Sequence, residues 1–250
     1  MTVPEPSRRS TPLRSCEVPH DCAVAVRLEV ISQAKYFRGL ADDAIAEIDA
    51  LMQVRGFGEG AHIYTAGGPA EHLFVLAEGR VKLSRTTESG RDVVVDIIGP
   101  GQLFGTLPTL GRTDYPDSAE ALTVCCVLRI RGDDFREVML RHPQVAVTVA
   151  GDLARQLEEA RHSVKLLSGS SVEQRVASAL LALAAKMGER EGDSTLIQVP
   201  LTRSDLAAMT GTTTESVSRV MSRLQKAGVI ETGRRWTSIL NLPALRSLAA

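Results

Sequence analysis

The feature that most constrains the fold is a change in the period of the apolar residues near residue 143. Between residues 56 and 130, short β-type runs alternate with turns such as Glu-Gly, Ser-Gly and Gly-Pro-Gly. Runs of this length separated by such turns are typical of antiparallel hairpins. From residue 143 to about residue 167 the period is helical. The sequence therefore predicts an α+β chain, with an antiparallel β-roll or barrel before residue 143 and mainly helices after it.

The predicted long helix over residues 143–168 carries a narrow apolar stripe. In a heptad frame, the a and d positions are all apolar over nearly three heptads: Ala150, Leu153, Leu157, Ala160, Val164 and Leu167. Charged residues occupy many of the remaining positions, so the pattern predicts a dimer seam with solvated flanks. The alternative is one amphipathic helix packed on its own domain. The small alanines favour the dimer, because they allow two helices to approach closely.

Residues 201–241 carry the strongest functional pattern. Thr202 can cap a short helix with Asp205, Gly211 supplies a sharp turn, and Thr212 with Glu215 forms a capping box for a second helix. One face of that second helix is apolar and the opposite face is polar: Val217, Val220, Met221 and Leu224 against Glu215, Ser218, Arg219 and Ser222. The segments VIETG and WTSILNL then flank a Gly-Arg-Arg turn and predict a wing-like hairpin. This order is typical of a winged helix-turn-helix, whose second helix enters the major groove of DNA.

The polar face of the second helix suits the reading of bases. Arg219 can donate two hydrogen bonds to guanine, Glu215 can accept from cytosine, and Ser218 is adaptable. The neighbouring side chains that could bind phosphates are Thr202, Arg203, Thr213, Thr214 and Arg223. From residue 194 onward, seven Lys or Arg stand against three Asp or Glu, although the whole chain has a net charge of only −1. The alternative is that Glu215 only completes a cap and Arg219 lies on a solvated face.

The order of β-roll, long helix and winged helix-turn-helix, with the segment TRSDLAAMTGTTTESVSRVMSRLQKAGVI, resembles the CRP/FNR superfamily of bacterial transcription regulators over about residues 37–245. The resemblance implies four parts. These are an N-terminal extension with a cysteine pair (1–36), a β-roll sensor domain of the cyclic-nucleotide-binding or jelly-roll type (37–142), a dimerisation helix (143–168) and a winged helix-turn-helix DNA-binding domain (169–250). It also implies a homodimer that binds double-stranded DNA and, in an activator, RNA polymerase. Glu215, Ser218 and Arg219 match the Glu-x-x-Ser-Arg pattern of the FNR branch, which implies palindromic half-sites similar to TTGAT.

The same resemblance bears on the effector. Cyclic-nucleotide-binding members have Gly-Glu-Leu for the ribose and an Arg-Ser or Arg-Thr pair for the phosphate. The matching positions here read Gly101-Gln102-Leu103 and Asp117-Ser118. Gln102 can still donate a hydrogen bond, but Asp117 places a negative charge where a phosphate needs a positive one. Cyclic AMP is therefore not the expected effector, and a cyclic-nucleotide-binding module is the disfavoured alternative.

The cysteines suggest a different effector, because FNR-type members hold a [4Fe-4S] cluster with N-terminal cysteines and one from the β-roll. The chain has four cysteines in a similar division: Cys16, Cys22, Cys125 and Cys126. It lacks the third N-terminal cysteine of the family, its pair lies farther upstream, and the mid-chain ligand position falls on Leu128. On a strand, Cys126 shares a face with Leu128 and Cys125 points to the opposite face. His20 could substitute as a ligand; a thiol or disulfide switch, another small ligand such as haem or nitric oxide, and no ligand at all remain as alternatives.

Other classes of protein are not expected. The sequence contains no HExxH motif and no Ser-His-Asp order, so an enzyme is not expected. No apolar run reaches the roughly 18 residues of a membrane span, and the polar, Pro-rich N-terminus is not a signal peptide. We therefore expect a cytoplasmic, redox-sensing regulator with no membrane partner. A ligand-independent regulator, or one that responds to a small metabolite, is the rival interpretation within the class.

Overall fold

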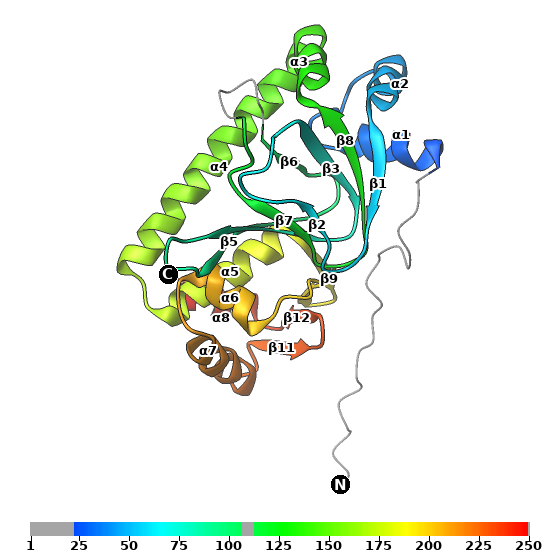
Figure 1. Cartoon of the computed structure of the whole chain (residues 1–250). Helices are drawn as coiled ribbons and strands as arrows, with labels where there is room; N and C mark the ends of the chain where they lie inside the picture. The colour runs from blue at the N-terminus through cyan, green and yellow to red at the C-terminus, as the bar shows by residue number, and fades with distance from the viewer. Residues whose placement is uncertain (1–22, 107–112, 250) are drawn as a thin grey trace.

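The computed structural model describes residues 23–106 and 113–249, and Figure 1 shows its ribbon. Two helices, α1 (Val24–Gln33) and α2 (Asp42–Leu51), precede the strands of the N-terminal half. Those strands are β1 (Gln53–Phe57), β2 (His62–Tyr64), β3 (His72–Glu78), β4 (Val81–Thr86), β5 (Asp92–Ile98), β6 (Leu103–Gly105), β7 (Ser118–Ala121) and β8 (Cys125–Arg131). The following elements are α3 (Gly132–Arg141), α4 (Pro143–Gly169), α5 (Val172–Met187), β9 (Gly188–Glu191), β10 (Ser194–Ile197), α6 (Arg203–Thr210), α7 (Thr214–Lys226), β11 (Ile230–Gly233), β12 (Trp236–Ile239) and α8 (Leu242–Ala249). The predicted α+β fold is confirmed.

The β-roll consists of two antiparallel four-stranded sheets, with strand orders β1-β8-β3-β6 and β2-β7-β4-β5. Alternate residues of each strand point to opposite faces, so β8 contributes to two cores. Val127 packs between the two sheets, whereas Leu128 and Ile130 pack beneath helices α1 to α4. The helices therefore cover the outer face of one sheet, and the N-terminal domain is a sandwich with an extra helical layer.

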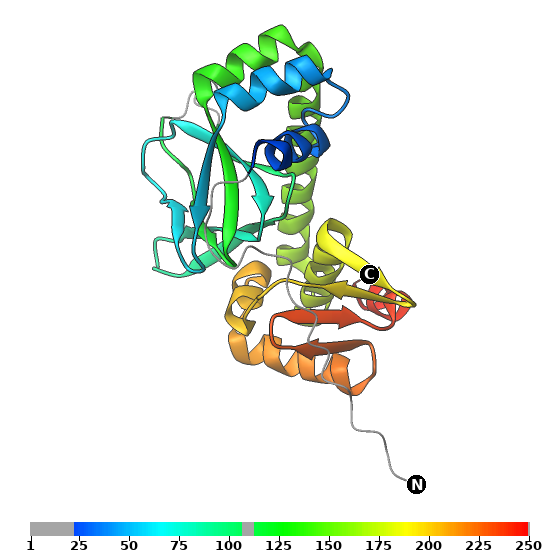
Figure 2. The same ribbon diagram turned by 90° about the vertical axis from the view of Figure 1, so that its right-hand side faces the viewer.

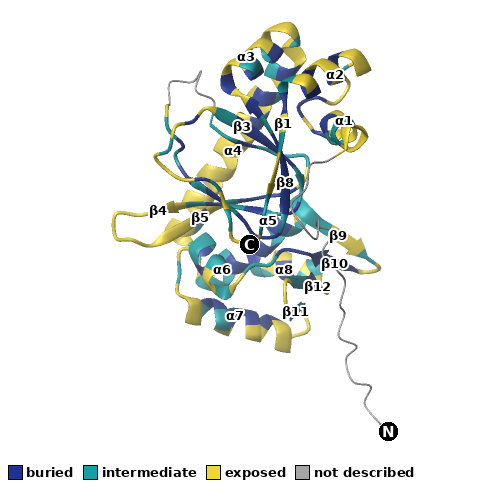
Figure 3. Ribbon diagram, turned by 45° about the vertical axis from the view of Figure 1, so that its right-hand side comes forward, coloured by how far each residue is buried: buried dark blue, intermediate teal, exposed yellow. Residues whose placement is uncertain are grey.

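Helix α4 packs on its own domain with a different stripe from the one that the heptads predict. Val145, Val149 and Asp152 are buried against the β-roll side. All six predicted seam residues are exposed in the single chain, and the larger ones keep 44% (Leu153), 52% (Leu157), 64% (Val164) and 51% (Leu167) of their surface. In Figure 3, the visible part of the α4 ribbon behind the β-roll is coloured mainly as exposed. The heptad stripe is thus an apolar surface that residues 23–106 and 113–249 of the same chain do not cover.

The structure differs from the sequence-based expectation at three segments. The composition of the segment GEREGDS, residues 188–194, predicts a polar loop, but these residues begin the antiparallel hairpin β9–β10. The strand β9 lacks an apolar alternation, so its pairing depends on β10, which in turn pairs with β12. The sequence pattern does not predict helices α3 and α8 either. Each of them is short, and α3 buries only Gly132, Phe135 and Val138.

The C-terminal domain packs α5 to α8 against a small sheet of strand order β11-β12-β10-β9 (Figure 2). Its core also includes Val94, Ile97 and Leu122 from the β-roll, so the two domains share apolar contacts. Lys82 of β4 forms ion pairs across this boundary with Asp205 of α6 at 3.2 Å and within the roll with Glu120 at 2.9 Å. Among the helices of the described residues, none is long and apolar enough to cross a membrane.

Candidate nucleic-acid interface

The helix pair begins at a capping box, as the sequence predicts. The hydroxyl of Thr202 accepts a hydrogen bond from the backbone N–H of Asp205, and the Asp205 carboxylate accepts one from the backbone N–H of Thr202. Leu206 is buried and Met209 is partly buried on the inner side of α6. Gly211 ends the helix in the left-handed conformation, with φ 60° and ψ 43°, which glycine adopts without steric cost. The sharp turn predicted at Gly211 is confirmed.

The predicted cap of the second helix is wrong by one residue. The hydroxyl of Thr213, and not that of Thr212, accepts a hydrogen bond from the backbone N–H of Ser216. Thr212 belongs to the preceding turn, where its N–H donates to the carbonyl of Ala207 at 3.1 Å. Helix α7 therefore begins at Thr214, and Glu215 lies in its first turn without completing a capping box.

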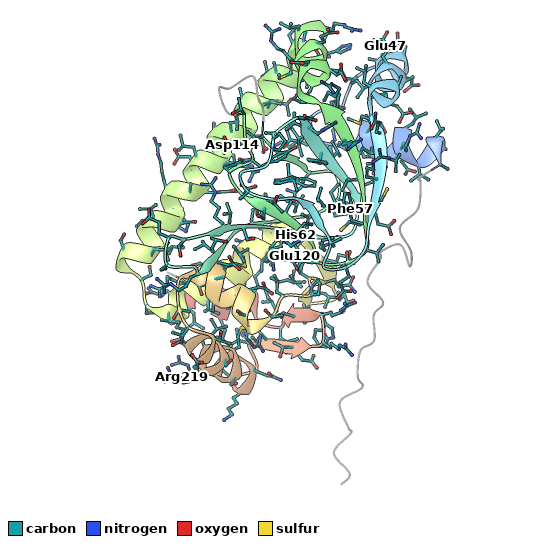
Figure 4. The ribbon with its side chains drawn as sticks, viewed as in Figure 1. Glu47, Phe57, His62, Asp114, Glu120 and Arg219 are labelled. Atoms are coloured by element: carbon teal, nitrogen blue, oxygen red, sulfur yellow. The ribbon has the colours of Figure 1, made fainter. Side chains whose placement is uncertain are left out.

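Helix α7 has the two faces that the sequence predicts. The four apolar residues Val217, Val220, Met221 and Leu224 are all buried in the core of the domain. On the opposite side Glu215, Arg219, Ser222 and Arg223 are exposed and Ser218 is partly buried. Figure 4 shows Arg219 on the side of α7 that faces away from the β-roll. The front of α7 is thus open to a macromolecular partner.

The charges on this front suit the reading of bases. The polar environment formed by the backbone N–H of Glu215 and the Thr213 hydroxyl, together with the nearby charge of Arg219, lowers the pKa of the Glu215 carboxyl. The carboxylate is therefore ionised at neutral pH and can accept from an amino group. The guanidinium of Arg219 donates to the Ser216 hydroxyl at 3.3 Å, a weak bond that leaves its other donors available. Arg223 lies 3.3 Å from Glu173 of α5, which steadies it beside the front.

A shallow hollow follows the outer surface of α7. Its lining residues are Ser218, Arg219, Ser222, Arg223 and Lys226. Lys226 was not among the predicted site residues, although it stands seven residues after Arg219 and therefore on the same helical face. Extending the period by one more turn would have found it. The hollow carries three cations and no acidic residue.

The remaining predicted phosphate contacts lie near the ends of the two helices. Thr202 and Thr214 are exposed, and Arg203 is partly buried, which lowers the pKa of its guanidinium. The wing hairpin β11–β12 carries Arg234 and Arg235 at its tip, and both are exposed. Arg235 has φ 73°, in the left-handed region, and its guanidinium pairs with Glu59 in the turn between β1 and β2. The wing therefore touches the β-roll through an ion pair.

The interior of the β-roll is filled by aromatic rings. Tyr64 and Tyr115 stack with centroids 3.9 Å apart, and Phe74 and Phe104 lie beside them, with all four buried. The Tyr64 hydroxyl donates to the buried carboxylate of Asp117 at 3.1 Å, and burial together with that negative charge raises the pKa of Tyr64. The guanidinium of Arg85 lies 3.8 Å from the second oxygen of Asp117.

Asp117 and Gln102, which stand at the positions that match the nucleotide-binding residues of the family, both have partners within the protein. Asp117 is engaged by Tyr64 and Arg85 as described above. The side-chain oxygen of Gln102 accepts a hydrogen bond from the N–H of Gly99 at 2.7 Å, so Gln102 closes the turn that follows β5.

The cysteines of β8 point to opposite faces of the strand, as the alternation predicts. Cys125 lies in the core between the two sheets, and its thiol lies 3.2 Å from the carbonyl oxygens of Arg80 and Thr123. Burial raises the pKa of this thiol, which disfavours the thiolate that binds iron. Cys126 is also buried, but on the face that carries Leu128. The four-cysteine set does not fit one cluster, because Cys125 and Cys126 cannot both reach it; Cys16 and Cys22 lie outside the described residues.

Comparisons with known proteins agree with this architecture. Residues 54–142 match the model of the cyclic nucleotide-binding domain, and residues 174–248 match that of the Crp-like helix-turn-helix domain. The chain is 33% identical over 213 residues to the "Cyclic AMP receptor protein" of Thermus thermophilus, which covers 85% of this chain and 95% of that protein. It is 27% identical to the "CRP-like cAMP-activated global transcriptional regulator" of Mycobacterium tuberculosis, over 81% of this chain and 90% of that protein.

The fold also matches a solved structure, that of FixK2 from Bradyrhizobium japonicum. The TM-score is 0.71 and the sequence identity 24%, with 80% of this chain and 98% of that chain covered. The overall fold of this chain is therefore shared with that structure. With a sequence match that spans nearly the whole of a curated relative, the chain belongs to the CRP/FNR family of transcription regulators.

Proposed function

We propose that this regulator acts as a homodimer and binds a palindromic DNA site with α7 of each protomer in the major groove. The observation that carries the proposal is the front of α7, which is exposed, polar and lined by three cations while its back is buried. The uncovered apolar stripe of α4 supports the dimer, because exposed leucines at heptad spacing are stabilised by a second helix. A two-fold dimer presents two such fronts, and a palindrome matches that symmetry.

The half-site that we propose is similar to TTGAT. Glu215, Ser218 and Arg219 stand on one exposed face of α7, at the spacing that resembles the FNR branch. Arg219 would donate to the guanine of the half-site, and Glu215 would accept from the amino group of the cytosine that pairs with this guanine. Arg223, Lys226 and the wing arginines would bind phosphates and set the position of the helix.

Sedimentation equilibrium and fluorescence anisotropy test this proposal together. The purified protein is expected to sediment as a dimer and to bind a TTGAT palindrome about a thousandfold more tightly than a scrambled duplex at the same salt concentration. A duplex with one half-site scrambled serves as the control, with an intermediate affinity. A monomer at micromolar concentration, or equal affinity for the palindrome and the scrambled duplex, would contradict the proposal.

Cyclic AMP is a second candidate effector, because the names of two relatives refer to it. We propose that it is not the effector of this protein. The buried carboxylate of Asp117 stands at the position that the family resemblance matches to a phosphate-binding arginine, and its charge opposes a phosphate. Isothermal titration calorimetry with cyclic AMP, and DNA binding with and without it, test this. Micromolar binding that raises DNA affinity would overturn the proposal.

Redox control by an iron–sulfur cluster stays a prediction. Cys125 lies in the core between the two sheets, so Cys126 is the cysteine of β8 on the face that carries the helical layer. Iron content and visible absorption of protein purified without air, for the natural chain and for Cys126→Ser and Cys22→Ser, check it. Colourless, iron-free protein whose DNA affinity is the same with and without oxygen would contradict the prediction.

A further inference from the structure

The connection between the long helix and the DNA-binding domain is short and extended. Helix α4 ends at Gly169, Ser170 has φ −104° and ψ 148°, and Ser171 has φ −63° and ψ 160° before it caps α5. Rotation about the bonds of two extended residues can turn the domain by a large angle. The covalent link alone therefore does not determine how the helix-turn-helix sits relative to α4.

A side chain of α4 rests directly on the turn of the helix-turn-helix. A Cβ atom placed on Gly211 would lie 2.8 Å from Cδ2 of Leu167, and no other described atom outside the neighbouring residues would lie within 4 Å of it. Gly211 therefore meets two requirements, a left-handed backbone and close approach of Leu167. Leu167 is also the last residue of the predicted seam and keeps 51% of its surface exposed. One side chain thus borders both the seam and the turn.

The turn is part of a tightly packed unit. Leu206 of α6 and Val217 and Met221 of α7 lie in one buried core on either side of Gly211. Packed interiors transmit displacements because they contain few voids. A shift of the turn therefore moves α7 as well.

Other contacts of the helix-turn-helix are made with strands β4 and β5 of the β-roll. Lys82 pairs with Asp205 of α6, and Val94 and Ile97 of β5 join the same core. These contacts bind the helix-turn-helix to the β-roll of its own chain. Leu167 connects it to the helix that carries the dimer seam.

We propose that Leu167 is a positioning residue that determines the distance between the two α7 helices of the dimer, and so the spacing of half-sites that the protein accepts. This inference rests on the proposed dimer on palindromic DNA. Two recognition helices of a dimer reach successive major grooves about 34–36 Å apart. When Leu167 contacts the turn at Gly211, the distance between the two α7 helices stays constant. Without this contact the turn can move relative to α4, and the distance between the two helices varies.

The test compares Leu167→Ala, Leu167→Val and Leu167→Met on palindromes whose half-sites are moved apart or together by one and two base pairs, and on a duplex with one half-site. Alanine and valine both lack the δ carbons, and valine keeps an apolar seam. Methionine restores a side chain of similar reach. Val164→Ala is the matched control, since Val164 is also an exposed seam residue, and none of its atoms lies within 4 Å of a Cβ placed on Gly211.

The natural chain is expected to prefer one spacing. In Leu167→Ala and Leu167→Val the preference for that spacing should fall about fivefold or more, a typical coupling between sites, while affinity for the single half-site is unchanged. Leu167→Met and Val164→Ala should keep the preference. A full preference in the valine variant, or an equal loss in Val164→Ala, would overturn the positioning role. No spacing preference in the natural chain would contradict the proposed palindromic dimer itself, and the inference with it.

Discussion

At the scale of single residues, the front of α7 depends on which side chains the local hydrogen bonds leave available. Thr213 and Ser216 are engaged in the cap, so they are less available to DNA than Glu215 and Arg219. Arg219 makes one 3.3 Å bond to Ser216, which a guanine can replace with two shorter bonds. We therefore expect the residue that contacts bases to contribute mainly to sequence-specific binding, and the residues that contact phosphates to contribute to the binding of any DNA.

Replacing Arg219 with alanine tests base reading. We expect Arg219→Ala to lose about 1–3 kcal/mol per half-site on the TTGAT palindrome and little on random DNA, because the lost bonds are to a base. Arg234→Ala, in the exposed tip of the wing, is the control and should weaken binding to both duplexes alike. Anisotropy titrations on the two duplexes measure the difference. Equal losses in Arg219→Ala on specific and random DNA would remove its reading role.

At the scale of secondary-structure elements, α4 has two separate stripes: one is buried on its own domain, and the other is the exposed stripe that we propose a second chain covers. On the inner side, the buried carboxylate of Asp152 accepts hydrogen bonds from Lys35, from the Tyr36 hydroxyl and from Arg155. This cluster attaches the segment after α1 to the helix. On the outer side, Leu153 and Leu157 remain exposed. The two stripes predict two different consequences of substitution.

On the inner stripe, Asp152→Asn should lower the free energy of unfolding by about 2 kcal/mol at neutral pH, because it removes charge-assisted hydrogen bonds. Burial alone would raise the pKa of Asp152, but the bonds from Lys35, Tyr36 and Arg155 hold it well below its usual range. The stabilisation is therefore complete above the unfolded pKa of about 3.9 and is lost as the pH falls from there through the folded pKa.

Urea denaturation at several pH values measures this effect. Glu158→Gln, which removes an exposed pair with Arg161, should change stability by less than about 0.5 kcal/mol and serves as the control. A difference between Asp152→Asn and the natural chain that does not shrink in acid would argue against the ionic origin.

On the outer stripe, Leu157→Asp should dissociate the dimer. The substitution places a charge in the middle of an apolar seam, where an unpaired charge costs several kcal/mol. Lys165→Asp changes a residue outside the a and d positions and should leave the dimer intact. Sedimentation velocity compares the two variants, and an unchanged dimer for Leu157→Asp would remove α4 as the interface.

At the scale of the whole molecule, the DNA-binding domain is held against the β-roll by scattered charges and a few apolar side chains. The wing arginine Arg235 pairs with Glu59, and Lys186 of α5 pairs with Asp96 of β5 at 2.6 Å. A cation engaged by a carboxylate of its own chain is less available to a phosphate. Glu59 therefore competes with DNA for the tip of the wing.

Glu59→Gln should raise the affinity for random DNA. The released Arg235 can add one phosphate contact, which should steepen the slope of log affinity against log salt by about 0.9 per contact. Glu88→Gln, in the exposed turn between β4 and β5, makes the same change in net charge and is the control. Salt titrations of both variants provide the measurement, and identical slopes would show that Glu59 does not restrain the wing.

The sequence by itself determined the features that follow from local periodicity and capping. The buried back of α7, the cap at Thr202, the turn at Gly211 and the exposed heptad stripe of α4 all involve residues within a few positions of one another, where the geometry of one helix decides which side chains share a face. The tertiary structure alone decided the partners of Asp117, the burial of Cys125, the hairpin at β9, and the contacts Glu59–Arg235 and Leu167–Gly211. The hairpin at β9 depends on the pairing of β10 with β12, and each of the other features joins segments far apart in the chain or depends on how the two sheets of the β-roll close. These contacts arise from tertiary packing, and the pattern of apolar and polar residues along the chain does not specify which distant segments pack together.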